Sequence, residues 1–216
     1  MTTAIDSSPN PRNGVITQAV RVAAGKFGGA LRFDGVNDWV TITDVTNSKL
    51  DLSTGMTLEA WVNPSSLSGW ECVLMKERGL AGEGLLSYAL YAHDGAPLAL
   101  GNAVPAGYIR LNNTAATTDQ AARGTTRLSL NTWTHLATTY DGTTQRFYVN
   151  GVLVGSNTPN QGSTNVITQS NGSLRIGGDA SSTGEFFNGM IDEVRIYNRA
   201  LSAAEIATDM ITKIIP

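Results

Sequence analysis

The amino-acid sequence predicts an all-β protein of two packed antiparallel sheets with one short helix at its C-terminal end. Glycine accounts for 23 of the 216 residues, which suits the tight turns between short strands. Short runs of β-branched and aromatic residues recur along the chain, and turn pairs such as Asp-Gly and Asn-Gly separate them. Helical periodicity is confined to the C-terminal end. Together these patterns predict a sandwich or jelly roll.

Length and composition indicate one domain. A chain of 216 residues with 41% hydrophobic content can fill one core, and a β-sandwich of this size is usually one domain. The segment 1–14 is polar and contains Pro9 and Pro11, so we expect it to be a linker or N-terminal extension. Residues 15–216 are then expected to form a single domain.

The charge balance excludes some classes of partner. The net charge is −3, which excludes a strongly basic protein that binds nucleic acid through bulk electrostatics. The one cysteine, Cys72, cannot form an internal disulfide. No apolar run approaches the roughly 20 residues that a membrane-spanning helix needs. We therefore expect neither a nucleic-acid partner nor a membrane span.

The strands can be placed from alternation and from turn residues. Within 57–64, for example, Leu58, Ala60 and Val62 share one face. Asn150-Gly151, between two apolar runs, predicts a two-residue type I′ hairpin. The polar segment 115–127 is expected to be an exposed loop. Strands are expected, in order, at residues 30–33, 39–43, 57–64, 72–75, 88–92, 108–112, 133–140, 145–149, 152–154, 174–178 and 190–197.

The C-terminal segment carries the signals of a helix. Ser202 and Glu205 have the spacing of a capping box, in which each side chain satisfies a free backbone amide of the other. Ile206, Met210 and Ile214 follow at four-residue spacing and would form one apolar stripe. We expect a short helix that packs on the sandwich.

Three motifs carry a family resemblance. The first runs from Gly25 to Val40. The second is Trp133-Thr134-His135-Leu136-Ala137, followed by Tyr140-Asp141-Gly142 and Phe147-Tyr148-Val149-Asn150-Gly151. The third runs from Phe187 to Ser202. Together they resemble the laminin-G-like, concanavalin A-like jelly-roll domains of bacterial extracellular proteins. The resemblance implies two curved sheets, glycan binding at the concave face or rim loops, and adjoining domains in a larger extracellular or cell-surface chain.

The resemblance also implies calcium, which many relatives hold. Asp34, Asn37 and Asp38 lie within five residues of one another, and Asp192 belongs to the third motif. In relatives the first and last strands run close together, which would bring Asp34 near Asp192. Oxygen ligands of this kind suit calcium. The alternative is that these residues only form a turn and a strand.

Candidate glycan-binding residues follow from the usual chemistry of sugar sites, which pair an aromatic ring with hydrogen-bonding groups. Trp70 follows a loop without a packing pattern and is the first candidate. Tyr108, Arg110 and Asn112 alternate with Ile109 and Leu111, so they share the face away from the core. The further candidates are Lys76, Arg78 and Tyr88, with His93 nearby. The alternative is an ordinary solvated face.

Catalytic patterns are weak. Glycosidases of related folds need two carboxylates close together on one face, but Glu71 and Glu77 are six residues apart. His135 lies in a structural motif of the resembled family. We therefore predict a non-catalytic carbohydrate-binding module with a structural calcium ion, acting on a polysaccharide or glycoconjugate. A protein-binding or structural spacer and a divergent polysaccharide lyase or glycosidase stay open as alternatives.

Overall fold

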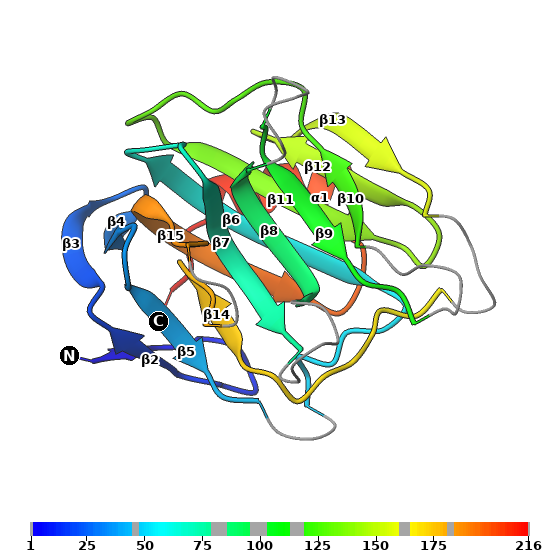
Figure 1. Ribbon diagram of the computed structural model, residues 1–216, viewed down its shortest axis with the longest axis horizontal. Helices are drawn as coiled ribbons and strands as arrows, with labels where there is room; N and C mark the ends of the chain where they lie inside the picture. The colour runs from blue at the N-terminus through cyan, green and yellow to red at the C-terminus, as the bar shows by residue number, and fades with distance from the viewer. Residues whose placement is uncertain are drawn as a thin grey trace.

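The computed structural model describes residues 2–44, 48–78, 86–95, 103–112, 119–159, 165–180 and 184–215. Within these ranges the strands form two antiparallel sheets that pack face to face (Figure 1). A single short helix lies near the C-terminal end of the described chain. The predicted all-β sandwich with a C-terminal helix is confirmed.

One layer is an eight-stranded sheet in the order β1-β2-β5-β14-β7-β8-β9-β10. Its strands are β1 (Thr3–Ala4), β2 (Gly14–Thr17), β5 (Trp39–Ile42), β14 (Leu174–Ile176), β7 (Trp70–Glu77), β8 (Leu86–Asp94), β9 (Ala106–Ile109) and β10 (Gln120–Arg123). Three of them, β1, β2 and β10, were not expected. Strand β1 lies within the segment interpreted as a linker and pairs with β2. Strand β10 lies within 115–127, so the expectation of a loop there is wrong for residues 120–123.

The other layer is a seven-stranded sheet in the order β13-β12-β11-β6-β15-β4-β3. Its strands are β13 (Val152–Asn157), β12 (Gln145–Val149), β11 (Thr134–Tyr140), β6 (Met56–Pro64), β15 (Asn188–Tyr197), β4 (Gly28–Asp34) and β3 (Val20–Gly25). Asn150 and Gly151 join β12 to β13 with φ values of 50° and 76°. Positive φ at both positions is what a type I′ turn requires, so the predicted hairpin is confirmed.

The core lies between the two sheets. Leu58, Ala60 and Val62 of β6 all face it, as their alternation predicted. Leu90 of β8 and Ile109 of β9 face it from the eight-stranded sheet, and both are fully buried. Each sheet therefore has a second, outward face on which function can be placed.

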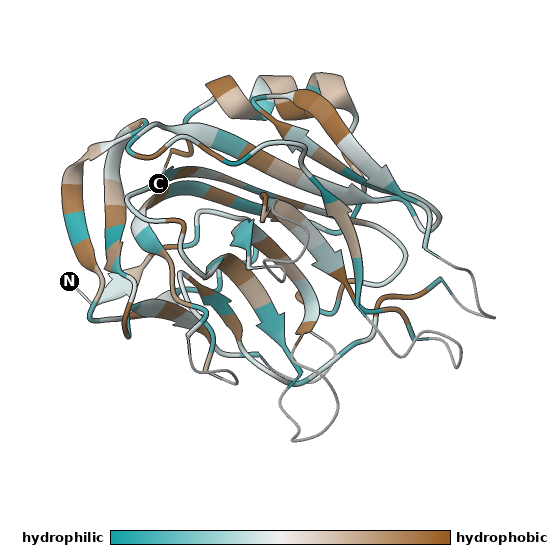
Figure 2. Ribbon diagram, turned by 45° about the horizontal axis from the view of Figure 1, so that its top comes forward, coloured by the Kyte–Doolittle hydropathy of each residue, from teal (hydrophilic) through white to brown (hydrophobic). Residues whose placement is uncertain are grey.

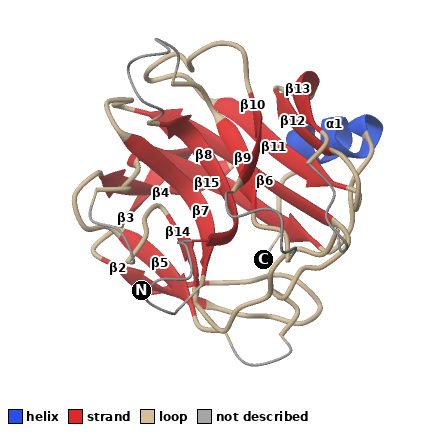
Figure 3. Cartoon of the chain, turned by 45° about the vertical axis from the view of Figure 1, so that its right-hand side comes forward, coloured by secondary structure: helices blue, strands red, loops and turns tan. Residues whose placement is uncertain are grey.

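Helix α1 (Ala203–Ile211) covers part of the outward face of the seven-stranded sheet (Figures 2 and 3). The expected capping box of Ser202 and Glu205 is present. Leu201 and Ile206 pack against the strands below. The apolar stripe is shorter than expected, because Ile214 follows the end of the helix and its amide donates to the Glu193 carboxylate at 2.6 Å.

The two sheets approach each other closely at one edge, where β13 meets β10. A Cβ atom added to Gly155 of β13 would collide with the backbone carbonyl oxygen of Arg123 in β10. The collision is with backbone, so a larger residue at position 155 must push the two strands apart. Gly155 thus allows β13 to approach the backbone of Arg123 closely.

We predict that Gly155→Ala lowers the free energy of unfolding by about 1–3 kcal/mol, the usual cost of overpacking. Gly69→Ala is the matched control, because a Cβ atom there meets nothing within 4 Å. That change is expected to stay within about 0.5 kcal/mol of the parent protein. Urea unfolding of both variants measures the difference, and equal stabilities would show that the β10–β13 contact is loose.

Candidate functional site

The candidate site lies on the side of the eight-stranded sheet that faces away from the core, which we call the outer face. Cross-strand pairing aligns one row of residues over six strands, from β5 to β10: Thr41, Arg175, Met75, Ala89, Tyr108 and Ala121. The neighbours of this row along the strands, such as Leu90 and Ile109, belong to the core. Because successive side chains point to opposite faces, the row lies on the outer face.

Three aromatic side chains gather on the outer face. The ring centroid of Trp70 lies 5.1 Å from that of Tyr91 and 5.9 Å from that of Tyr108, and the two tyrosine rings are 5.5 Å apart. Both tyrosines are buried, whereas Trp70 is only half-buried. Trp70 therefore presents a ring to solvent from a platform that is already packed.

A buried carboxylate organises the polar side of this platform. Asp94, at the end of β8, is fully buried and accepts hydrogen bonds from the Tyr108 hydroxyl at 3.1 Å and from Arg123 Nε at 2.6 Å. Arg123 Nη2 donates to the Tyr108 hydroxyl at 2.6 Å. Burial and the Asp94 charge raise the pKa of Tyr108, so its hydroxyl stays protonated at neutral pH.

Arg123 is the exposed member of this network. Its guanidinium carbon lies 5.4 Å from the Tyr108 ring centroid, and 48% of its side chain is exposed. A guanidinium has five N–H donors. In Arg123, Nε donates to Asp94 and Nη2 donates to the Tyr108 hydroxyl. Within the described part of the chain no group accepts a hydrogen bond from Nη1. The network thus holds an arginine in one position with donors toward solvent.

The outer face continues along β9. Arg110 follows β9 and pairs with Asp119 at 3.1 Å, and Asn112 beyond it is exposed. Ile109 and Leu111 face the core, which confirms the predicted alternation in this segment. Ala106 of β9 pairs with Arg123, and Arg110 lies four positions further along the chain. Four positions span about 14 Å along a strand. Trp70, Arg123, Tyr108 and Arg110 therefore form an elongated track.

Part of the outer face is covered by the chain itself. The carbonyl oxygen of Gly178 lies 3.7 Å from Cys72 Sγ, and the amide of Ala180 donates to Glu77 at 2.8 Å. Glu185 accepts from the Tyr91 hydroxyl at 2.7 Å. The described parts of the segment 177–187 thus lie over β14, β7 and β8, beside the track.

Two of the expected ligand residues point into the sandwich instead. Tyr88 is buried in the core, and its hydroxyl donates to the carbonyl of Leu50 at 2.9 Å. Lys76 is also buried, with Nζ 2.8 Å from Asp44 and 2.7 Å from the carbonyl oxygen of Gly172. Contrary to expectation, neither side chain reaches the outer face.

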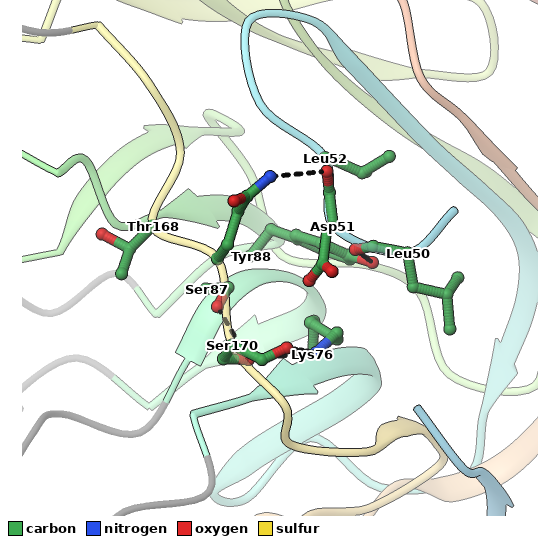
Figure 4. Close-up of a pocket in the computed structure, with 9 residues that line it drawn as sticks. Leu50, Asp51, Leu52, Lys76, Ser87, Tyr88, Thr168 and Ser170 are labelled. Atoms are coloured by element: carbon green, nitrogen blue, oxygen red, sulfur yellow. Dashed lines mark hydrogen bonds between the residues drawn. The ribbon is translucent and has the colours of Figure 1, made fainter. Parts of the chain in front are cut away.

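These two residues line a small niche at one end of the sandwich (Figure 4). Its other lining residues are Leu50, Asp51, Leu52, Ser87, Thr168, Gln169 and Ser170. Ser87 and Ser170 hydrogen-bond to each other at 3.2 Å, and Lys76 donates to both oxygens of Ser170. The lining groups largely satisfy one another, so we interpret the niche as a joint between loops.

The remaining candidates lie at opposite ends of β7. Arg78 follows the C-terminal end of β7, whereas Trp70 begins the strand. His93 pairs with Glu71 across the sheet, next to Trp70, and its Nδ1 atom lies 2.5 Å from the carbonyl oxygen of Gly69. The structure thus places Trp70, Tyr108 and Arg110 along one side of the sheet, with Asn112 beyond Arg110. It turns His93 to the opposite side, with its partner Glu71, and separates Arg78 from Trp70.

The four expected calcium ligands do not converge. Asp34 of β4 pairs with Asn188 of β15, four residues before Asp192, which is about 14 Å along the strand. The expectation that the strands bring Asp34 near Asp192 is therefore wrong. Asp192 accepts a hydrogen bond from the amide of Phe27 at 3.1 Å. Its carboxylate is therefore used away from the turn that contains Asp34.

The turn itself uses its carboxylates internally. Asp34 accepts from the amide of Val36 at 2.8 Å, and Asp38 accepts from the amide of Asp34 at 2.9 Å, while Asn37 is exposed. Over the described ranges, no group of three or more His, Cys, Asp and Glu side chains could hold a metal ion. These residues do not fit a shared calcium site, and calcium binding stays an untested prediction.

One pair of carboxyl groups on the outer face bears on catalysis. Glu77 hydrogen-bonds to the Asp179 carboxyl, to Arg175 at 2.7 Å and to the amide of Ala180. Both acids are buried, and burial raises the pKa of Glu77. They anchor residues 177–180 and do not line the exposed track. His135 is buried in the other sheet, with Nε2 3.7 Å from Glu59.

Three residues of the site were not expected from the sequence. Asp94 precedes a glycine and reads as a turn residue, whereas its carboxylate is fully buried. Arg123 lies between small and polar residues that show no strand alternation. Tyr91 could have been found, because it shares the outward-facing positions of β8 with Ala89.

Comparisons with known proteins agree with this architecture. The concanavalin A-like lectin/glucanases superfamily matches residues 34–207. No curated protein matches the chain. Among the described residues, no helix is long and apolar enough to cross a membrane.

Several solved structures share the fold at low sequence identity. Domain 4 of an extracellular arabinanase from Geobacillus stearothermophilus, in complex with arabinotriose, is 20% identical with a TM-score of 0.69, covering 90% of this chain and 82% of that one. The binding domain of Paraclostridial mosquitocidal protein 1 is 16% identical with a TM-score of 0.64, covering 96% and 47%. Trypanosoma rangeli sialidase is 19% identical with a TM-score of 0.62, covering 93% and 29%. This chain thus spans less than half of the last two.

Glu71, beside Trp70, gives a pH test of the local structure. It is buried, accepts from the amide of Asn188 at 2.8 Å, and burial raises its pKa from 4.5 to about 6. The folded state therefore holds this proton more tightly than the unfolded state. The contribution of Glu71 to the free energy of unfolding is fully present below pH 4.5, and about 2 kcal/mol of it is lost as the pH rises through about 6.

We predict that Glu71→Gln removes this pH dependence, so the variant gains stability relative to the parent protein between pH 4.5 and 7. Urea unfolding at several pH values measures it. Glu205→Gln is the control, and we expect it to lose stability relative to the parent protein over the same pH range. Arg199 and Ser202 lower the pKa of Glu205 to about 2, so its ionised form stabilises the fold. If the free energy of unfolding of Glu71→Gln changes with pH as that of the parent protein does, Glu71 is solvated.

Proposed function

The chain belongs to the concanavalin A-like lectin/glucanases superfamily, and on that premise we propose that it is a non-catalytic carbohydrate-binding module. The observation that carries the proposal is Arg123, half-exposed and fixed by Asp94 beside the rings of Trp70 and Tyr108. An aromatic ring next to immobilised donors is what a sugar needs. The apolar face of the sugar stacks on the aromatic ring, and the sugar hydroxyls accept hydrogen bonds from the donors.

Each group on the track has a separate task in this proposal. The exposed part of Trp70 stacks on a sugar ring. Arg123 Nη1 donates to hydroxyl or ring oxygens, and the fixed guanidinium loses little conformational freedom on binding. Arg110 and Asn112 extend the contacts along β9. Tyr108 is a positioning residue, because its hydroxyl is already engaged by Asp94 and Arg123.

The structural neighbours support this choice only as relatives. The arabinanase domain was solved with arabinotriose, and the mosquitocidal neighbour is a binding domain. At identities of 20% and 16% they share the fold, and the sugar that this chain binds does not follow from them. A location outside the cell or on its surface is part of the same proposal.

A hydrolase is the second function that an observation favours. The fold also occurs in enzymes, and Glu77 and Asp179 form a carboxyl pair on the outer face. A glycosidase must present both carboxyl groups to the substrate, about 5–5.5 Å apart in retaining enzymes. Both acids here are buried and hold residues 177–180, which is why we propose binding without hydrolysis.

We predict that Trp70→Ala abolishes binding to a polysaccharide that the parent protein retains, in affinity gel electrophoresis. Trp70 packs on Tyr91 and Tyr108, so circular dichroism must first show that the variant is folded.

Arg110→Ala is a second variant with less risk to folding, and we expect it to weaken binding by about 10- to 100-fold, the loss of one hydrogen bond from a charged donor. Arg146→Ala is its matched control, because Arg146 pairs with Asp141 in the same way but lies in the other sheet. Retention of a polysaccharide by Trp70→Ala at the strength of the parent protein would overturn the proposed site.

A further inference from the structure

The charges of the outer face are arranged in pairs. Arg123 lies 2.6 Å from Asp94, Arg110 lies 3.1 Å from Asp119, and Arg175 lies 2.7 Å from Glu77. These three arginines come from β10, the end of β9 and β14, so the pairing extends across the sheet. Every one of these guanidinium charges is neutralised by its own carboxylate before any ligand arrives.

The pairing distinguishes between ligand charges. A carboxylate or sulfate on a sugar would approach each guanidinium within a few ångströms of a fixed carboxylate. Like charges at such distances repel, and this repulsion offsets the attraction to the arginine. Glu185, which accepts from the Tyr91 hydroxyl, adds a further acidic group to the face. The net charge of −3 gives a polyanion no long-range attraction.

An uncharged sugar meets none of this repulsion. Its hydroxyls accept hydrogen bonds from N–H groups that the carboxylates leave unused, such as those of Arg123 Nη1. The track from Trp70 and Arg123 to Arg110 follows β9 for about 14 Å, which is longer than a single sugar ring. The length suits several consecutive sugars of one chain.

The geometry points to a neutral polysaccharide chain, lying along β9, as the ligand of the outer face. This inference rests on the proposed function and adds the charge class and the minimum length of the ligand. Paired arginines act as hydrogen-bond donors with little net charge, so binding depends weakly on ionic strength. An anionic ligand would instead release counterions and bind more weakly at high salt.

The test is affinity electrophoresis of the parent protein in gels that contain single polysaccharides. The neutral probes are arabinan, xylan, galactomannan and mixed-linkage β-glucan, and the acidic probes are polygalacturonate, alginate and hyaluronan, each at low and high salt. We expect retardation by at least one neutral polymer, unchanged by salt, and none by the acidic polymers. Oligosaccharides of increasing length should compete at least tenfold better from three sugars upward than single sugars do.

The outcomes separate the two proposals. Retardation only by acidic polymers, lost at high salt, would overturn the neutral-ligand inference and leave carbohydrate binding intact. Equal competition by single sugars would overturn the extended track. No retardation by any of the polymers would overturn the proposed function together with the inference.

A charge variant tests the pairing itself. Asp119→Asn removes the carboxylate partner of Arg110, which we expect to create salt-sensitive binding to polygalacturonate that the parent protein lacks. Asp141→Asn is the matched control, because it uncovers Arg146 in the other sheet. A gain in both variants, or in neither, would show that the Arg110–Asp119 pair does not set the charge preference.

Discussion

The carboxylate of Asp94 is the group on which the candidate site depends. It is fully buried at the end of β8 and binds Tyr108 on β9 and Arg123 on β10. A buried carboxylate is costly unless charged and hydrogen-bonding partners surround it, so these two side chains are held to it. Three neighbouring strands are thereby joined through their side chains, and Arg123 keeps one position although half of it is exposed. The aromatic rings and the solvent-facing donors of the site keep their relative geometry because of this one group.

The two faces of the sandwich have different roles. Helix α1 covers part of the outward face of the seven-stranded sheet, where Leu201 and Ile206 pack on β11 and β12. On the eight-stranded sheet, the described residues 177–180 and 184–187 lie over β14, β7 and β8, and the aromatic platform and paired arginines lie beside them. A layered β-sandwich needs only its inner faces for the core, so the outer face of the second sheet is available for recognition.

The sequence predicted the layers and the hairpin well, because alternation and turn residues are local signals. It predicted for the same reason that Tyr108 and Arg110 lie on the face of the sheet away from the core. It failed for Tyr88 and Lys76, since β7 and β8 are buried on both faces and carry no polar and apolar contrast. Register irregularities between these strands disturb the alternation further. The expected meeting of Asp34 and Asp192 failed because it depended on the register of β4 against β15, which no local pattern specifies. Asp94 and Arg123 meet only through tertiary structure.

The most direct test of the central claim, that sugars bind on the outer face, uses the four tryptophan indole N–H signals in a nuclear magnetic resonance titration. The probe is an oligosaccharide of a polysaccharide that the protein retains. The account predicts that the Trp70 signal shifts, while that of Trp61, which donates to the Met210 carbonyl beneath helix α1, stays in place. A shift of the Trp61 signal with an unmoved Trp70 signal would place the binding site on the other sheet and contradict the account.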